Sequence, residues 1–257
     1  MFGLFDRKKR FLEPHLEEWQ VETWLYLLYH LGGTDKVVAR QPLVAGQGLV
    51  PSKPLESHDE VLALAKELQA YMGLEDLHFE LVEEIALGGR VSTFVVVPTT
   101  KPLGTFRIEE GQAIITYSER LLSTPSHLIA VLGHELCHYA MQTIWEAPPG
   151  AEEEPMIEEL ATDLACCYFG LGIVIANSAF EFAQHTSFES QGWQSSFSGY
   201  LSEEGRIFSL AIHLALRGET QAPALKPHLQ KQLTRALERL QAEPSILQSL
   251  KSVVSRV

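Results

Sequence analysis

The chain has 257 residues, of which 46% are hydrophobic and 21% charged, and its formal net charge is −13. This length accommodates one large domain or two small ones around a buried core, and the composition is that of an ordinary globular protein. A surface that binds nucleic acid needs an excess of basic residues. The acidic balance therefore argues against nucleic acid as a partner.

The cysteines, the amino terminus and the most apolar run indicate the cellular compartment of the protein. The three cysteines, Cys137, Cys166 and Cys167, are odd in number and two are adjacent, so no disulfide framework is expected and a reducing, cytoplasmic location is predicted. The amino terminus lacks the basic-then-apolar order of a secretory signal, and its basic cluster Arg7–Arg10 is predicted to be solvated. The most apolar run, Leu164–Ala176, is shorter than the roughly 20 residues that cross a bilayer, so no transmembrane segment is predicted.

The first third of the chain is predicted to be helical. Apolar residues recur at helical spacing over Pro14–Leu31 and again over His58–Met72, and a glycine follows each segment. Residues 32–57 are rich in glycine and proline and show no periodicity, which predicts a long connection between the two helices.

A change of pattern then predicts a small sheet. Residues 77–82 alternate in polarity and residues 91–97 are rich in β-branched side chains. Two further strand-like segments, Thr105–Ile108 and Ala113–Tyr117, flank a turn at Glu109–Gly111 and are predicted to form a hairpin. Four strands are therefore expected in this region.

From position 126 the pattern is helical again. The expected helices are Ser126–Trp145, Pro155–Ala176, Glu203–Arg217, and a final stretch from Pro223 interrupted at Pro244. The fold class predicted is α+β, as one domain over residues 14–257 behind a tail of residues 1–13. Its parts would be a helical lead (14–73), a sheet (77–117), two chemistry-bearing helices (126–176) and a helical remainder (177–257).

The segment His134–His138, HELCH, carries the chemistry. Two histidines four residues apart stand on the same face of a helix, so both imidazoles can reach one ion. Glu135 lies to the side, where it can take a proton from a metal-activated water, as in H-E-x-x-H peptidases. Such a pentapeptide arises by chance in about one sequence of this composition in 25, so a second feature is needed.

The flanking residues favour a helix around this motif. Ser126 follows Pro125 and is predicted to cap the start of the helix. The apolar side is supplied by residues at helical spacing, namely Leu128, Ile129, Val131, Leu132 and Leu136.

The second feature is an acidic pair at the start of the next helix. Catalytic zinc sites take three protein ligands and leave one position for water, and Glu159 can complete a His₂Glu set. Asp163, one turn further on, can accept the free ring N–H of a zinc-bound histidine. Glu158 and Glu159 also fit the simpler role of acids that complement a helix dipole. Asp163 is the only aspartate after position 76 and lies among apolar residues, so it needs a partner.

H-E-x-x-H followed by E-x-x-x-D on the next helix resembles the gluzincin group of zinc metallopeptidases, over about residues 105–176. The resemblance implies a zincin-like fold, in which a small mixed sheet packs against the active-site helix and a helical half follows. It also implies that His134, His138 and Glu159 bind Zn²⁺, that Glu135 is the general base, and that Asp163 orients a ligand. The edge strand that would hold an extended substrate is expected at Ala113–Tyr117.

Other zinc families match less well. The metzincin extension needs glycine at position 141 and histidine at position 144, where this chain has Met141 and Ile144. The G-x-M-E-N segment of many gluzincin aminopeptidases is absent. The HELCH wording resembles SprT-like peptidases, which use a third histidine as ligand.

Peptide hydrolysis also gains from a hydrogen-bond donor that stabilises the oxyanion. Four downstream residues are candidates for this role: His185, Tyr200, Arg206 and His213. Tyr200, which follows Ser198 and Gly199, is the first candidate. His213 lies in an apolar run and is predicted to be a core residue, and the three cysteines are predicted to be core filler.

The function predicted is therefore a zinc-dependent metallopeptidase, an endopeptidase acting on a peptide or protein substrate. Two alternatives stay open. One is a regulatory or interaction protein that binds zinc with little turnover. The other is an interaction domain without metal, in which both motifs arose by chance. The sequence does not indicate an oligomeric state or a cleavage preference.

Overall fold

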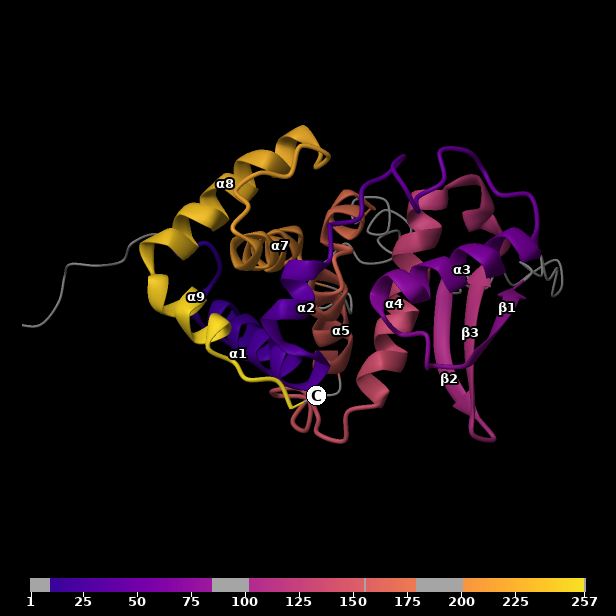
Figure 1. Ribbon diagram of the computed structural model, residues 1–257, viewed down its shortest axis with the longest axis horizontal. Coiled ribbons are helices and arrows are strands. Elements are labelled where there is room, and N and C mark those ends of the chain that lie inside the picture. The colour runs from indigo at the N-terminus through magenta and orange to yellow at the C-terminus, as the bar shows by residue number, and fades with distance from the viewer. Residues whose placement is uncertain (1–9, 85–101, 155, 179–200, 257) are drawn as a thin grey trace, which may run out of the picture. The chain divides into compact units, whose positions relative to one another are not determined.

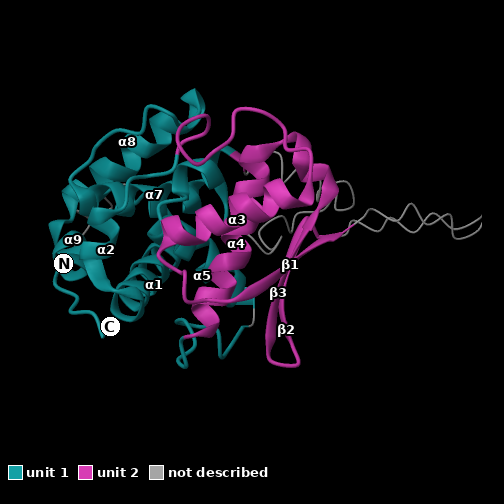
Figure 2. Cartoon of the chain, turned by 45° about the vertical axis from the view of Figure 1, so that its right-hand side comes forward, with its two compact units in different colours: residues 1–43, 144–177, 196–257 teal, residues 44–143, 178–195 magenta. Residues whose placement is uncertain are grey.

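The computed structural model describes residues 10–84, 102–154, 156–178 and 201–256 (Figure 1). It has the predicted mixed α+β content, with one small sheet and a majority of helix. The chain divides into two compact units (Figure 2). Unit 1 comprises Met1–Leu43, Ile144–Asn177 and Ser196–Val257, and unit 2 comprises Val44–Thr143 and Ser178–Ser195.

Unit 2 contains the sheet. Its described strands are β1 (Phe79–Glu84), β2 (Gly104–Glu109) and β3 (Gln112–Ser118), in the order β1-β3-β2. β3 is parallel to β1 and antiparallel to β2, so the sheet is mixed, as predicted. The β2–β3 hairpin turns at Glu110 and Gly111, which both have positive φ angles, the combination that a type I′ turn requires.

Two helices of unit 2 accompany the sheet: α3 (His58–Met72) and α4 (Pro125–Gln142), the latter preceded by the 3₁₀ turn Glu119–Ser123. α4 packs on both β2 and β3, and α3 packs on α4 (Figure 1). Tyr139 near the end of α4 donates a hydrogen bond to the carbonyl of His78 (2.9 Å), just before β1. The motif helix is therefore attached to the sheet along its length.

Unit 1 is helical throughout its described part. Its helices are α1 (Pro14–Leu31), α2 (Gly33–Ala39), α5 (Met156–Tyr168), α7 (Glu203–Arg217), α8 (Pro227–Ala242) and α9 (Pro244–Lys251), and residues 172–177 are also helical. The core is formed by apolar faces that α1, α5 and α7 turn toward one another, with Trp24, Tyr168 and Phe208 fully buried.

Buried polar contacts fix the register of these helices. The Trp24 indole donates to Ser209 Oγ (2.9 Å), and Arg239 of α8 forms a buried ion pair with Glu17 of α1 (2.6 Å). The packed chain begins before α1, because the Phe11 side chain is only 7% exposed and its ring stacks on that of Phe208.

Three expected helices are observed with nearly their predicted bounds. α1 and α3 end at glycines in the left-handed conformation, Gly32 and Gly73, and α7 ends in the same way at Gly218. The predicted interruption at Pro244 is also confirmed, since α8 ends at Ala242 and α9 begins at that proline.

The predicted connection over residues 32–57 was wrong at its start, where α2 is found. Gly32 and Gly33 both have positive φ angles, which turns the chain sharply from α1 into α2. Val37 of α2 is fully buried, and the Arg217 guanidinium donates to the carbonyls of Val37 (3.1 Å) and Val38 (2.6 Å). A seven-residue helix is too short for periodicity to reveal, and these contacts to α7 hold it.

The single helix predicted over Pro155–Ala176 was also wrong, because it is interrupted at Gly170. Gly170 has a φ of 83°, its N–H donates to the Cys167 carbonyl, and the Leu171 N–H donates to the Cys166 carbonyl. This pair of bonds is the Schellman pattern that ends a helix at a glycine. The continuous apolar sequence hid the break, and the glycine was the available signal.

Two further predictions are corrected in unit 2. Ala113–Tyr117 was expected at an edge of the sheet, but β3 is the central strand, and all five of these residues are buried. Ser126 was expected to cap the motif helix, but α4 begins at Pro125, with Thr124 in the capping position and no capping hydrogen bond from its side chain. Proline is favoured at the first helical position, so the helix begins one residue earlier than predicted. The strand predicted over residues 91–97 lies outside the described residues.

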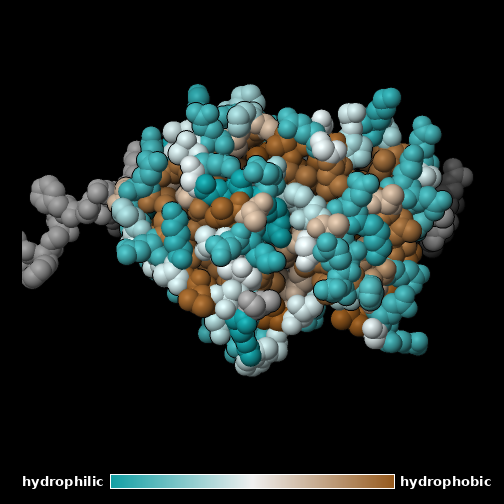
Figure 3. Space-filling view, viewed as in Figure 1, coloured by the Kyte–Doolittle hydropathy of each residue, from teal (hydrophilic) through white to brown (hydrophobic). Residues whose placement is uncertain are grey.

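On the face shown in Figure 3, hydrophilic residues are spread widely, with smaller apolar areas between them. Within the described ranges, no helix combines the length and the apolar character needed to cross a membrane.

Candidate metal centre

Helix α4 places the two histidines of the motif on one face of unit 2. The side chains from Leu128 to Cys137 are all buried, as expected for a helix that is apolar on most sides. His134 is 9% exposed and Glu135 is 7% exposed, while His138 is half-buried, so the motif is buried at its start and partly open to solvent at its end.

The imidazoles of His134 and His138 converge. Their Nε2 atoms are 3.1 Å apart, and the two rings meet at an interplanar angle of 80° with centroids 4.7 Å apart. At that distance one ring N–H can donate to the other nitrogen, or both lone pairs can face one ion. Two nitrogens on a tetrahedral zinc at about 2.0–2.1 Å are about 3.3 Å apart. The histidine pair therefore fits a zinc ion with little rearrangement.

Strand β2 borders the motif. The ring of Phe106 lies parallel to that of His138, with an interplanar angle of 3° and a centroid distance of 6.4 Å. It also stacks on Tyr139, with centroids 5.3 Å apart. These contacts restrict the plane of the His138 ring. Two residues earlier on the same face of β2, Gly104 lies beside Glu135 Oε1.

The acidic residues lie on α5 in unit 1. Glu158 is exposed at the start of the helix and Glu159 is half-buried. Burial first, and then the charges of Glu146 and Glu158, raise the pKa of Tyr26 of α1 to about 12. Neighbouring residues on a helix point about 100° apart. Because the Glu158 charge acts on Tyr26, the Glu159 side chain points in a different direction from that tyrosine.

Asp163, one turn after Glu159, is 3% exposed and has the partner that its burial requires. Its Oδ2 accepts a hydrogen bond from the Leu201 backbone N–H (2.9 Å) and pairs with the Arg206 guanidinium (3.4 Å). Sequence reasoning had considered Arg206 only as an oxyanion donor, and its contact with Asp163 was missed. The contact predicted between Asp163 and a ligand histidine stays a prediction.

The described residues contain one group of three potential ligands: one atom each of His134, His138 and Glu159 lie within 4.8 Å of one another. These are the three residues predicted as metal ligands. Two imidazoles and a carboxylate form a donor set that binds Zn²⁺ and other first-row transition metals.

The structure describes only one of the other three candidates for the oxyanion donor. Tyr200 and His185 lie outside the described residues. His213 lies on α7 in the core of unit 1 and is 1% exposed, as predicted. Burial, followed by the charges of Arg217 and Arg40, lowers its pKa to about 3, so it is neutral at physiological pH.

The three cysteines are free thiols and all are buried, in agreement with the prediction that they pack in the core. Burial raises the pKa of Cys167 to about 12, against a hydrogen bond from Ser209 that lowers it. A thiol that stays protonated is a poor nucleophile and a poor metal ligand, so Cys167 is a packing residue.

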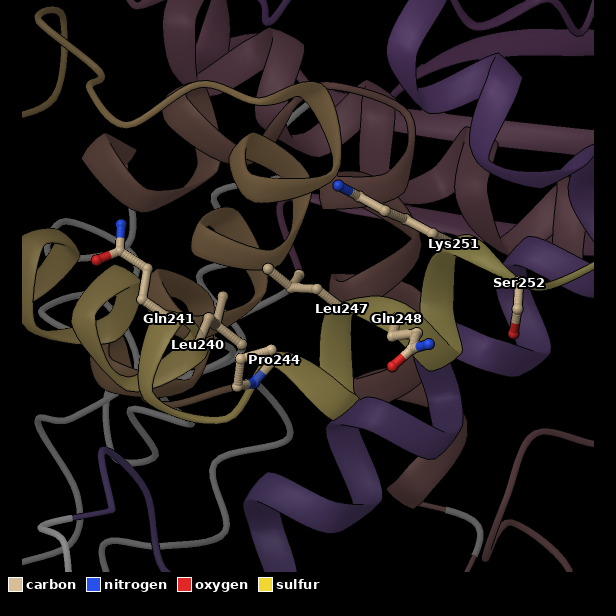
Figure 4. Close-up of a pocket in the computed structure, with 7 residues that line it drawn as sticks. All are labelled: Leu240, Gln241, Pro244, Leu247, Gln248, Lys251 and Ser252. Atoms are coloured by element: carbon tan, nitrogen blue, oxygen red, sulfur yellow. The ribbon is translucent and has the colours of Figure 1, made fainter.

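A pocket of about 540 Å³ lies along α8 and α9 in unit 1 (Figure 4). It is lined by residues between Leu240 and Ser252, and Lys251 is the single charged residue in its lining. The three metal-binding candidates and Glu135 do not line it. Its lining holds no histidine, cysteine or carboxylate.

Comparison of the chain with known protein families, with characterised proteins and with solved structures gives no match.

Proposed function

We propose that this protein is a zinc-dependent metallopeptidase of the gluzincin type. The observation that carries the proposal is the convergence of His134 and His138, whose Nε2 atoms lie 3.1 Å apart on a buried helix. Two ring nitrogens at this distance either share a hydrogen bond or face one ion, and a third potential ligand beside them favours the ion. The proximity of Glu159 to the same atoms supports it as the third ligand.

Glu135 is proposed as the general base. It follows His134 directly, to the side of the face that the two histidines share, and it is almost wholly buried. When bound, zinc supplies Lewis-acid chemistry, polarising a carbonyl and lowering the pKa of a water to about 7. Glu135 would take a proton from the water whose oxygen bonds to the carbonyl carbon, and would pass that proton to the amine nitrogen as the C–N bond breaks. Tyr200 remains the first candidate for the oxyanion donor.

Asp163 is proposed to orient a ligand histidine. Its Oδ2 is held by Leu201 and Arg206, which fixes the carboxylate in one position. A carboxylate fixed in this way is a better orienter of an imidazole than a mobile one, and such outer partners affect metal affinity strongly.

The substrate proposed is an extended peptide or an unfolded protein segment. Among the described strands, β2 lies at an edge of the sheet and packs on α4. An edge strand has unpaired backbone groups that can hold an extended chain. The role first expected of Ala113–Tyr117 is therefore proposed for β2. Three free thiols favour a reducing, cytoplasmic compartment.

The deciding experiment compares wild type with Glu135→Gln. Both proteins are purified without chelator, their zinc content is measured by elemental analysis, and hydrolysis of a denatured protein is followed. We expect one zinc per chain in both. Hydrolysis should fall about 10²–10⁴-fold in the variant, because the amide cannot accept a proton.

Two results would redirect the proposal. Less than a tenth of an equivalent of zinc in the wild type, even after reconstitution, would leave no metal for the reaction. Full zinc content with no turnover of any denatured substrate would favour a zinc-binding regulatory protein instead.

A further inference from the structure

The start of strand β2 is crowded by the motif helix. A methyl group placed on Gly104 would overlap Val131 Cγ1, and it would lie 3.0 Å from the Thr116 carbonyl oxygen and 3.2 Å from Glu135 Oε1. Real contacts of a β-carbon are almost never below 3.0 Å. The α-carbon of Gly104 therefore lies against α4 at a position where no side chain fits.

Backbone conformation does not explain the glycine. Gly104 is not among the residues with positive φ, and it lies in a regular antiparallel pair with Tyr117. Glycine weakens a strand and needs a reason there. The reason in this strand is space, and the space is occupied by Val131 and Glu135, which are one turn apart on the same face of α4.

We propose that Gly104 is a positioning residue for Glu135: the absence of a side chain at this point of β2 sets the place of the Glu135 carboxylate. This inference rests on the proposed role of Glu135 as general base. Within unit 2, the strand bounds the carboxylate on one side, which limits the positions open to it before it accepts a proton.

The two neighbours respond differently to an added methyl group. Val131 is β-branched, and in a helix such a side chain has one strongly preferred rotamer, so it cannot turn away and the helix must shift. The Glu135 carboxylate is the end of a flexible side chain, and it can move while the helix stays. With Val131 shortened, Gly104→Ala should therefore displace the carboxylate, and it should press on the Thr116 carbonyl oxygen whether or not Glu135 is present.

The test is a double-mutant cycle in a Val131→Ala background, combining Gly104→Ala with Glu135→Ala. The measurement is the midpoint of thermal unfolding. With Glu135 present we expect Gly104→Ala to lower the midpoint by roughly 2–6 °C. When the Glu135→Ala change is also present, the loss should be measurably smaller, because the contact with the Thr116 carbonyl oxygen remains but the contact with the carboxylate is gone. Equal losses in the two backgrounds would overturn the proposal.

Gly172→Ala is the matched control. Gly172 also has an ordinary φ, and a methyl group there would lie 3.1 Å from Leu210 Cδ1 and 3.2 Å from Cys167 Sγ. It belongs to unit 1, whereas Glu135 belongs to unit 2. Its effect on the unfolding midpoint should be the same with and without the Glu135→Ala change.

Zinc content and hydrolysis complete the test. Relative to Val131→Ala alone, the variant with Gly104→Ala added should keep its zinc and lose at least about tenfold in hydrolysis of a denatured protein. Gly172→Ala should leave hydrolysis unchanged. Hydrolysis equal to that of Val131→Ala would show that Gly104 only makes room for packing. If the wild type hydrolyses nothing, the proposed function fails, and the unfolding cycle still decides whether Gly104 positions Glu135.

Discussion

Both units contain a buried histidine, but among the described residues only the one in unit 2 lies beside a second histidine. α4 of unit 2 carries His134 and α7 of unit 1 carries His213, each within a buried and largely apolar helix, with 9% and 1% exposure respectively. His134 faces His138 one turn away, with ring nitrogens 3.1 Å apart. Within the described ranges His213 belongs to no group of potential metal ligands, and the charges that act on it are those of Arg217 and Arg40.

The comparison shows that burial alone does not mark a functional histidine. Burial lowers the pKa of His213 and keeps that imidazole neutral, yet no described histidine lies beside it to share an ion. The α4 pair also directs two ring nitrogens to one place, which is what a metal needs. A cation next to His213 would be repelled by two guanidinium groups. The following predictions test this distinction, from the largest expected effect to the smallest.

Removing one histidine of the pair should have the largest effect. His134→Ala or His138→Ala should lower zinc affinity roughly 100- to 1,000-fold. This estimate follows because each protein ligand contributes about three to four kcal/mol to the free energy of zinc binding. Competition titration with a zinc chelator measures the affinity. His127→Ala, two turns earlier on α4, is the control and should bind zinc as the wild type does. Retention of zinc by both single variants would remove the distinction between α4 and α7.

The acidic ligand should come next. Glu159→Ala should lower zinc affinity by about 100-fold, since it removes one of three protein ligands. Glu158→Ala should leave the affinity unchanged and lower the pKa of Tyr26, on which the Glu158 charge acts. The chelator titration and an ultraviolet titration of tyrosine measure the two effects. Loss of zinc in Glu158→Ala with retention in Glu159→Ala would reverse the ligand assignment.

Asp163→Asn should cost roughly 10- to 100-fold in zinc affinity, the usual penalty for an outer partner of a metal ligand. The same change also breaks the buried pair with Arg206, so a companion variant is needed. Arg206→Met breaks the pair but keeps the carboxylate, and it should bind zinc within a few-fold of wild type. Equal losses in the two variants would mean that Asp163 acts only through its ion pair.

The smallest effect concerns the pH dependence of stability. His213 binds a proton near pH 6.5 when unfolded but only near pH 3 when folded, because burial lowers its pKa. Between those values the unfolded chain holds more protons, so stability falls as the pH falls. From pH 7 to pH 5.5 His213 should lower the free energy of unfolding by about 1 kcal/mol. Urea unfolding at the two pH values measures it, and His213→Leu should be less sensitive to the same change.

Much of the local structure was predictable. α3 and α7 have apolar residues at helical spacing and end at Gly73 and Gly218, which adopt the left-handed conformation that stops a helix. The hairpin turn at Glu110 and Gly111 was marked by its glycine in the same way. The convergence of His134 and His138 also follows from local geometry, because residues four apart on a helix share a face.

Other features depended on residues far away in the chain. α2 is too short to persist alone, and Arg217 from α7 binds its last carbonyls. Phe106 was placed over His138 by the pairing of β2 with β3 and the packing of α4 on both. No periodicity in the sequence contains these contacts.

The same division holds within the candidate site. The sequence by itself determined which residues are candidates for the metal site and on which helix faces they lie, since the spacing of a helix is a local property. Only the tertiary structure decided that Arg206 and Leu201 hold the Asp163 carboxylate, and that Glu135 lies against a glycine of β2. Those contacts join segments tens of residues apart. They exist because packing and the need to pair buried polar groups bring the segments together.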